Sequence, residues 1–125
     1  MSDALDTVMW FEVATEDPEG AQRFYGELFG WTFAADPGSA EAGMDYRLIT
    51  YPGAQAPSGG IFATGGKMRP HAIFSVAVAD VEAACERVEK LGGTVTSKVV
   101  GAAGGPDFAY VTDPAGNLFG LFAPK

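Results

Sequence analysis

The chain contains one long pattern twice. Residues 8–33 and 72–96 each consist of an apolar strand-like run, an aspartate, an amphipathic segment, a glycine and a second strand-like run. When Asp17 is aligned with Asp80, apolar residues coincide at Phe11/Phe74, Val13/Val76, Ala21/Ala84 and Leu28/Leu91. Self-similarity over this length indicates a duplicated structural unit.

The match continues beyond the helical segments. Residues 45–52 resemble residues 107–114, and residues 60–63 resemble residues 120–123. The sequence therefore predicts a single domain, residues 1–125, made of two βαβββ units at about 8–64 and 71–123. The expected fold class is α+β, with the tandem units forming a cupped, incomplete eight-stranded barrel that carries two outer helices.

Turn residues and capping signals give the expected element bounds. Asp17 and Asp80 are predicted helix N-caps, and Gly30 and the pair Gly92-Gly93 end the helices. The expected inner helix stripes are Ala21, Phe24, Tyr25 and Leu28, and Val81, Ala84, Val88 and Leu91. The expected strands are 8–15, 31–35, 45–51, 60–64, 72–78, 94–100, 107–112 and 118–122. Residues 36–43 are predicted to be a polar turn, and residues 101–106 a mobile loop at the mouth of a cavity.

Composition narrows the functional classes. The net charge is −8, and residues 1–62 hold ten acidic and two basic residues, which disfavours binding to nucleic acid. No apolar run approaches the roughly 20 residues that a membrane helix needs, and no signal peptide is visible. Cys85 is the only cysteine, so an internal disulfide is excluded and a cytoplasmic location is expected.

Strand alternation predicts where a ligand would bind. In each first strand, one face (Phe11 and Val13, or Phe74 and Val76) is expected to cover its own helix. The opposite face would then line the interior, and it carries Trp10 and Glu12, or Ile73 and Ser75. A concave, largely apolar interior is the usual place for a small molecule.

Three motifs resemble the vicinal oxygen chelate superfamily, which includes glyoxalase I, extradiol dioxygenases and bleomycin-resistance proteins. They are Asp17 with residues 24–31 (FYGELFGW), residues 78–80 with 91–93 (VAD and LGG), and residues 113–117 (DPAGN). The resemblance covers nearly the whole chain and implies the cupped fold described above. It also implies a divalent metal held by histidine and glutamate from each first and fourth strand.

This chain departs from that metal-binding pattern. The resemblance places the four ligands at Trp10, Gly60, Ile73 and Gly120, and none of these side chains can coordinate a cation. No metal or other cofactor is therefore expected at the usual site. A shifted site built from His71, Glu12 and water remains an alternative.

Several residues are candidates for ligand contacts, and each has a structural alternative. Glu12 could anchor a ligand or act as a general base, or it could be a salt-bridged or rim carboxylate. Arg47 could neutralise Glu12 or clamp an anion, or it could point to solvent. The aromatic candidates for stacking on a planar ligand are Trp10, Tyr46, Phe108 and Tyr110, which could equally be core residues.

These observations favour a metal-free protein that binds a small organic molecule in an apolar cavity, and sequestration of an aromatic or antibiotic-like ligand is one purpose it could serve. Two alternatives remain open. One is an enzyme: a glyoxalase-like lyase or dioxygenase with a displaced metal, or a metal-free isomerase with Glu12 as base. The other is a regulatory domain that binds a protein. Because relatives of this kind often dimerise, and because a small sheet leaves exposed edges, a homodimer is expected.

Overall fold

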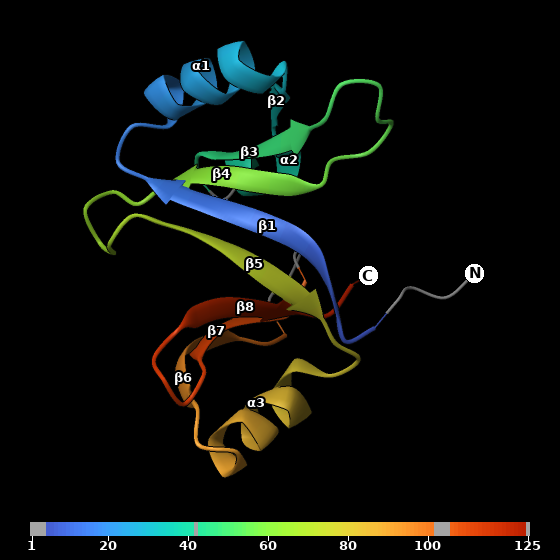
Figure 1. Ribbon diagram of the computed structural model, residues 1–125, viewed down its shortest axis with the longest axis vertical. Coiled ribbons are helices and arrows are strands. Elements are labelled where there is room, and N and C mark those ends of the chain that lie inside the picture. The colour runs from blue at the N-terminus through green and yellow to red at the C-terminus, as the bar shows by residue number, and fades with distance from the viewer. Residues whose placement is uncertain (1–4, 42, 102–105, 125) are drawn as a thin grey trace. The chain divides into compact units, whose positions relative to one another are not determined.

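The computed structural model describes residues 5–41, 43–101 and 106–124, and its topology repeats (Figure 1). Its elements in chain order are β1 (Thr7–Thr15), α1 (Pro18–Phe29), β2 (Thr32–Ala35), α2 (Pro37–Glu41), β3 (Tyr46–Thr50), β4 (Gly59–Ala63), β5 (His71–Ala77), α3 (Val81–Lys90), β6 (Thr94–Val99), β7 (Phe108–Thr112) and β8 (Leu118–Phe122). The eight predicted strands and two predicted helices are all present, with boundaries that differ by a few residues.

The two repeats have the same strand pairing. In the first, β1 is parallel to β4, and β3 lies antiparallel to both β4 and β2. In the second, β5 is parallel to β8, and β7 lies antiparallel to both β8 and β6. The strand orders β2-β3-β4-β1 and β6-β7-β8-β5 are therefore equivalent, which confirms the predicted α+β fold of tandem βαβββ units.

The chain forms two compact units. One comprises residues 11–72, and the other comprises residues 73–125 together with residues 1–10. The start of the chain joins the second unit partly through a hydrogen bond of 2.7 Å from the Asp6 amide to the Ala77 carbonyl.

The two aspartates at the centre of the repeat cap their helices as predicted. Asp17 Oδ1 accepts a hydrogen bond of 3.0 Å from the Gly20 amide, and Asp80 Oδ1 accepts one of 3.1 Å from the Ala83 amide. Each bond satisfies one of the amides that a helix start leaves without an intrahelical partner. Gly30 follows α1 with a φ of 76°, which a residue with a side chain rarely adopts.

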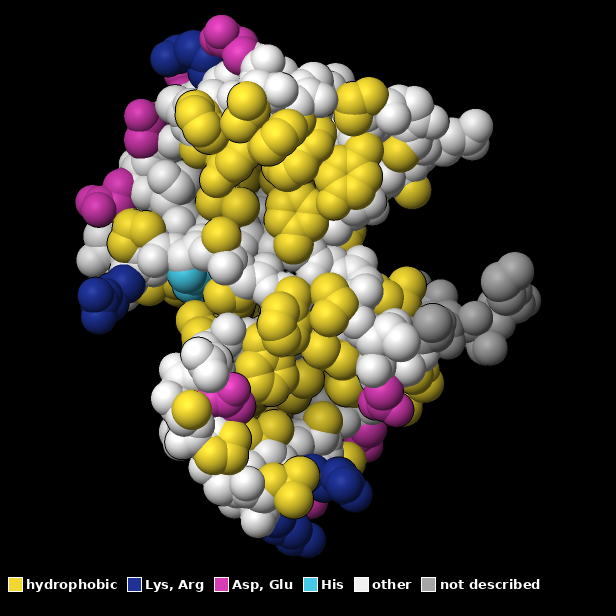
Figure 2. Space-filling view, viewed as in Figure 1, with side chains coloured by type: hydrophobic (Ala, Val, Ile, Leu, Met, Phe, Trp, Pro, Cys, Tyr) yellow, Lys and Arg dark blue, Asp and Glu magenta, His cyan; other side chains and the backbone are white. Residues whose placement is uncertain are grey.

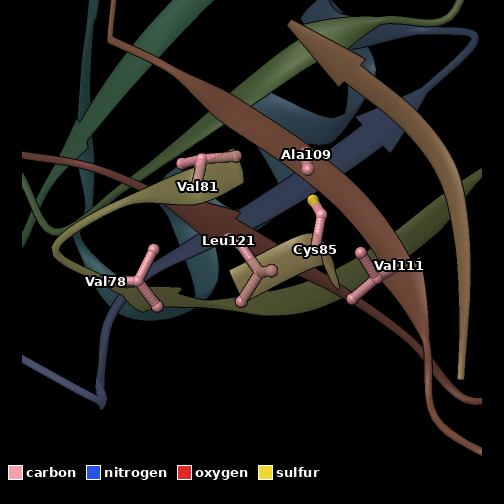
Figure 3. Packing of buried hydrophobic residues seen from close by; sticks show 6 residues of the cluster. All are labelled: Val78, Val81, Cys85, Ala109, Val111 and Leu121. Atoms are coloured by element: carbon pink, nitrogen blue, oxygen red, sulfur yellow. The ribbon is translucent and has the colours of Figure 1, made fainter. Parts of the chain in front are cut away.

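Each unit has its own hydrophobic core between a helix and its sheet. In residues 11–72 the core contains Val13, Ile49 and Ile61, packed against Ala21, Tyr25 and other half-buried side chains. In the other unit it consists of Val78, Val81, Cys85, Ala109, Val111 and Leu121, which Figure 3 shows gathered around α3. Val13, and Val76 at the edge of the second core, therefore lie on the helix-covered faces, as strand alternation predicts.

The apolar stripes predicted for the two helices include residues that the structure exposes to solvent. Phe24 and Leu28 of α1 are 61% and 57% exposed, and Leu91, just beyond α3, is 68% exposed. A short helix against a narrow sheet covers only the residues that point most directly at it, here Ala21 and Tyr25, and even these are half-buried. The expectation that Phe24, Leu28 and Leu91 are inner residues is wrong.

The polar turn predicted at residues 36–43 contains the short helix α2. Asp36 precedes Pro37 and accepts hydrogen bonds from the amide (3.3 Å) and the hydroxyl (2.6 Å) of Ser39. This is the same combination of capping aspartate and following proline that begins α1. In the predicted loop 101–106, residues 102–105 lie outside the described part of the chain, while the Gly101 amide donates to Asp107 Oδ1 at 2.8 Å.

The Cys85 thiol lies inside the second core and is 3% exposed. Burial raises its pKa, because the thiolate would lose its hydration. We expect the native protein to react with a thiol-specific disulfide reagent at least about tenfold more slowly than the urea-unfolded chain. The absorbance of the released thiol measures the two rates, and equal rates would show that Cys85 is accessible in the fold.

None of the helices among the described residues is long and apolar enough to cross a membrane.

Candidate functional site

The strands β2-β3-β4-β1 form a face that points away from α1, and this face carries a buried carboxylate. Glu12, in the middle of β1, is only 9% exposed. Its Oε2 accepts a hydrogen bond of 3.1 Å from the hydroxyl of Tyr46, the first residue of β3. A buried carboxylate needs hydrogen-bond donors, and the phenol of Tyr46 supplies one without adding a charge.

Gly60 makes this contact possible. In the register of the sheet, Gly60 pairs with Glu12 on one side and with Leu48 on the other. A Cβ atom at position 60 would overlap the ring and the hydroxyl of Tyr46. The phenol therefore occupies the space above Gly60 that a side chain there would need.

Aromatic rings continue the same face of the sheet. Tyr46 pairs with Phe62 in the register, and their rings are parallel with centroids 5.8 Å apart. His71, at the start of β5, meets the Phe62 ring edge-on at 6.3 Å. Burial lowers the pKa of His71, because the charged imidazolium would be poorly solvated there. Burial therefore favours the neutral form of the imidazole.

The second unit has a related arrangement with different residues. Ser75, which is 7% exposed, pairs with Gly120, and a Cβ at position 120 would lie 2.5 Å from the Ser75 hydroxyl. Tyr110 pairs with Gly120 from the other side, and its ring contacts Phe108 at 6.0 Å. Each unit therefore places two predicted site residues beside a glycine. Glu12 and Tyr46 lie beside Gly60, and Ser75 and Tyr110 lie beside Gly120.

Arg47 lies on the other face of its sheet. It pairs with the core residue Ile61, and its Nη1 donates a hydrogen bond of 2.8 Å to Gln22 of α1. Its Nε and Nη2 bind Asp45 at 2.9 and 3.0 Å, and this pairing holds the pKa of the Asp45 carboxyl below its usual range. The expectation that Arg47 neutralises Glu12 is wrong, because adjacent residues of a strand point to opposite faces and Tyr46 takes the inner position.

The remaining predicted residues, Trp10 and Ile73, are half-buried in β1 and β5. With Gly60 and Gly120 they occupy the positions where the superfamily resemblance places metal ligands. An indole, an alkyl chain and the two glycine hydrogens have no lone pair with which to coordinate a metal ion. Tyr46 and Ser75 fill the space beside the two glycines. Among the residues that the structure describes, no three histidine, cysteine or acidic side chains are grouped so as to hold a metal ion. The residues present do not fit the usual metal site.

Phe62 is a residue of this face that the sequence analysis missed. Its signal was present, because Phe62 lies two residues after Gly60 and strand alternation puts both on one side. Gly60 was recognised only as a missing ligand, whereas its absent side chain is what admits Tyr46.

Comparison with known proteins places this geometry in a family. Residues 10–122 match the family described as the Glyoxalase-like domain. A glyoxylase-like domain-containing protein of Didymella fabae is 31% identical over 112 residues, which cover 88% of each chain. The putative glyoxylase CFP32 of Mycobacterium tuberculosis is 28% identical over 118 residues, or 93% of this chain. Those residues make up 45% of that relative, so the chain spans about half of its length.

Solved structures share the fold at low sequence identity. Methylmalonyl-CoA epimerase from Mycobacterium tuberculosis superposes with a TM-score of 0.64 at 19% identity, covering 100% of this chain and 93% of the epimerase. A single-residue variant of the Streptomyces coelicolor epimerase, in complex with 2-nitronate-propionyl-CoA, gives 0.61 at 14% identity, covering 96% and 95%. These solved structures show the fold, and the family match over residues 10–122 shows that the chain belongs to the glyoxalase-like domain family.

Proposed function

We propose that the chain binds a small, partly planar organic molecule at the face formed by Glu12, Tyr46 and Phe62, without a metal at the family's usual positions. The supporting observation is the buried Glu12 carboxylate held by the Tyr46 hydroxyl above Gly60. A carboxylate and a phenol together offer acceptor and donor groups to a ligand, and the neighbouring rings offer apolar contact.

A second candidate function is metal-free isomerisation with Glu12 as the general base. The same buried carboxylate favours it, because a base removed from bulk water can take a proton from a carbon next to a carbonyl group. The carbonyl oxygen then receives the electron pair of the broken C–H bond, Glu12 holds the proton, and delivery of a proton from water to the opposite face of that carbon gives the isomer. Solved structures of this fold include methylmalonyl-CoA epimerases.

The protein is proposed to act as a homodimer in the cytoplasm, without nucleic acid or membrane partners. The acidic first half, with ten acidic and two basic residues in positions 1–62, supports the exclusion of nucleic acid. The sequestration of an aromatic or antibiotic-like ligand is the purpose that we propose for a purely binding protein.

The proposal is tested by following amide resonances during titration with methylmalonyl-CoA, 2-nitronate-propionyl-CoA and bleomycin. We expect at least one of these probes to shift the amides of Glu12, Gly60 and Phe62, and to bind at least about tenfold more weakly to Glu12→Gln. Glu16→Gln, an exposed carboxylate after the same strand, is the matched control and should bind normally. Shifts confined to residues outside this face, or an absence of binding by all three probes, would contradict the proposal.

Deuterium exchange separates binding from isomerisation. If Glu12 is a base, wild-type protein in D₂O introduces deuterium next to the thioester carbonyl of methylmalonyl-CoA, and Glu12→Gln abolishes this exchange. If the probe binds and no deuterium enters, the protein binds the ester without acting as an isomerase on it.

A further inference from the structure

A groove lies between α1 and the strands β2 and β3, on the face of the sheet opposite Glu12. Its volume is about 610 Å³, which is within the range of small-molecule sites. Residues of all three elements line it, including Glu19, Gln22 and Gly26 of α1, Phe33 of β2 and Arg47 of β3. Figure 2 shows basic, acidic and hydrophobic side chains on the part of the surface that carries α1. The groove therefore combines both signs of charge with apolar surface.

The second unit shows that the fold does not need polar side chains at this boundary between helix and sheet. When the two units are aligned, Gln22 corresponds to Cys85 and Arg47 corresponds to Ala109. Arg47 and Ala109 also have equivalent partners in the registers of their sheets. Cys85 and Ala109 are 3% and 1% exposed and belong to the hydrophobic core of the second unit. The first unit thus has an amide and a guanidinium where small apolar side chains are sufficient for packing.

The Arg47 guanidinium keeps donors that its neighbours do not use. Its side chain is only 19% exposed, so hydrogen bonds must replace the water that it loses. Asp45 accepts from Nε and Nη2, and Gln22 accepts from Nη1, which together use three of the five N–H groups. None of the residues that the structure describes accepts from the other two. These two donors remain for an anionic group in the groove.

Opposite charges meet at this end of the groove. Glu19 lies one turn before Gln22 on the same side of α1, and Gln22 is bound to Arg47 at 2.8 Å. The pKa of Arg47 is raised, mainly by its hydrogen bonds with Asp45 and further by the charges of Asp45 and Glu19. The guanidinium and the Glu19 carboxylate therefore border the same space.

The other end of the groove is apolar. Gly26 lies one turn after Gln22, about 6 Å along the helix axis. A Cβ atom at position 26 would be 3.8 Å from the ring of Phe33, so the missing side chain leaves room beside that ring. The distance from the charged end to the apolar end is close to the length of a branched or aromatic amino-acid side chain.

We propose that this groove binds a free α-amino acid with a branched or aromatic side chain. The ligand carboxylate accepts hydrogen bonds from Arg47, its ammonium group faces Glu19, and its side chain lies against Phe33. A simple carboxylate is repelled by Glu19 and Asp45, and a simple amine does not use the donors of Arg47. The site goes beyond the one proposed at Glu12, and neither depends on the other.

Titration with L-leucine and L-phenylalanine, followed by amide resonances, tests the proposal. We expect at least one of them to shift the amides of Gln22, Gly26 and Phe33, with a dissociation constant on the order of 0.1–1 mM. The corresponding acids without the amino group are 4-methylpentanoate and 3-phenylpropionate, and the corresponding amines are 3-methylbutylamine and 2-phenylethylamine. Each analogue lacks one charged contact and should bind at least about tenfold more weakly than its parent.

Two variants separate the charged contacts. Arg47→Ala introduces the residue of the second unit and should weaken the amino acid at least about tenfold. Glu19→Gln should weaken the amino acid without weakening the acid analogue, because that analogue has no ammonium group. Arg87→Ala removes an exposed arginine of α3 and is the control that should bind normally. Far-UV circular dichroism checks that each variant is folded.

Three outcomes would overturn the proposal. The first is that neither amino acid shifts the groove amides, and the second is that an acid analogue binds as tightly as its parent. The third is full affinity in Arg47→Ala. If that variant does not fold, Glu19→Gln decides: an equal effect on the amino acid and on its acid analogue would count against an ammonium contact and hence against the proposed ligand.

Discussion

Gly93→Ala is expected to lower the free energy of unfolding by about 2–3 kcal/mol. A Cβ atom at position 93 would overlap the carbonyl oxygen of Thr112 and lie 2.7 Å from Cγ1 of Val88. The Thr112 oxygen belongs to the backbone of β7, beside the start of β6, so no side-chain rotation removes the clash. Urea denaturation followed by circular dichroism measures the change, provided that the m-value is unaltered.

Gly26→Ala is the control, and we expect it to raise the free energy of unfolding rather than lower it. Gly26 lies inside α1, where the nearest atom to an added Cβ is the Trp31 carbonyl oxygen at 3.4 Å. Alanine is a better helix former than glycine, so Gly26→Ala should stabilise the protein by about 0.5–1 kcal/mol. If Gly93→Ala is as stable as the wild type, α3 and β7 do not approach position 93 as closely as the structure shows.

Tyr46→Phe is expected to lower the free energy of unfolding by about 1–3 kcal/mol, because Glu12 loses the phenol as a hydrogen-bond donor while remaining buried. The ring itself stays in place against Phe62, so packing changes little. Tyr51→Phe is the matched control: Tyr51 belongs to the same unit and is 38% exposed, and its loss of a hydroxyl should change stability by less than about 0.5 kcal/mol.

A double-mutant cycle identifies Glu12 as the reason for the loss. Tyr46→Phe should cost less in a Glu12→Leu background than in the wild type, because leucine has no lone pair to satisfy. The coupling is expected to be about 1 kcal/mol or more. Additive effects would show that Tyr46 does not stabilise the protein through Glu12.

Patterns with a strict local cause could be predicted from the sequence. The two capping aspartates, the alternation along β1 and the repeat of four strands per unit all appear in the structure, because capping and pleating depend on neighbouring residues. The helix α2 was missed although Asp36-Pro37 carries the same signal as Asp17-Pro18. The glycine at position 38 and the brevity of the segment concealed it.

Features that depend on distant residues could not be predicted. The sequence shows that Glu12 is charged within an apolar strand, but its partner Tyr46 is 34 residues away and only the register of β1, β4 and β3 brings them together. The exposure of Phe24 likewise depends on how much of α1 its sheet can cover. For Arg47, alternation within β3 decides the face, and the sequence does not reveal which parity points inward.

The role of Gly60 links the fold to the proposed function. Superfamily resemblance makes position 60 a place for a metal-binding side chain, and the structure has Tyr46 in that space instead. A ligand at this face would then meet a carboxylate and a phenol rather than a cation.

The most direct measurement is the metal content and metal affinity of the purified protein. Elemental analysis by mass spectrometry, followed by calorimetric titration with zinc, nickel, cobalt and iron(II), covers the cations that histidine and carboxylate ligands prefer. We predict well under one ion per chain after purification, and no binding tighter than about 100 μM in the titrations. One tightly held ion per chain, lost in Glu12→Gln or in a variant of His71, would contradict the account.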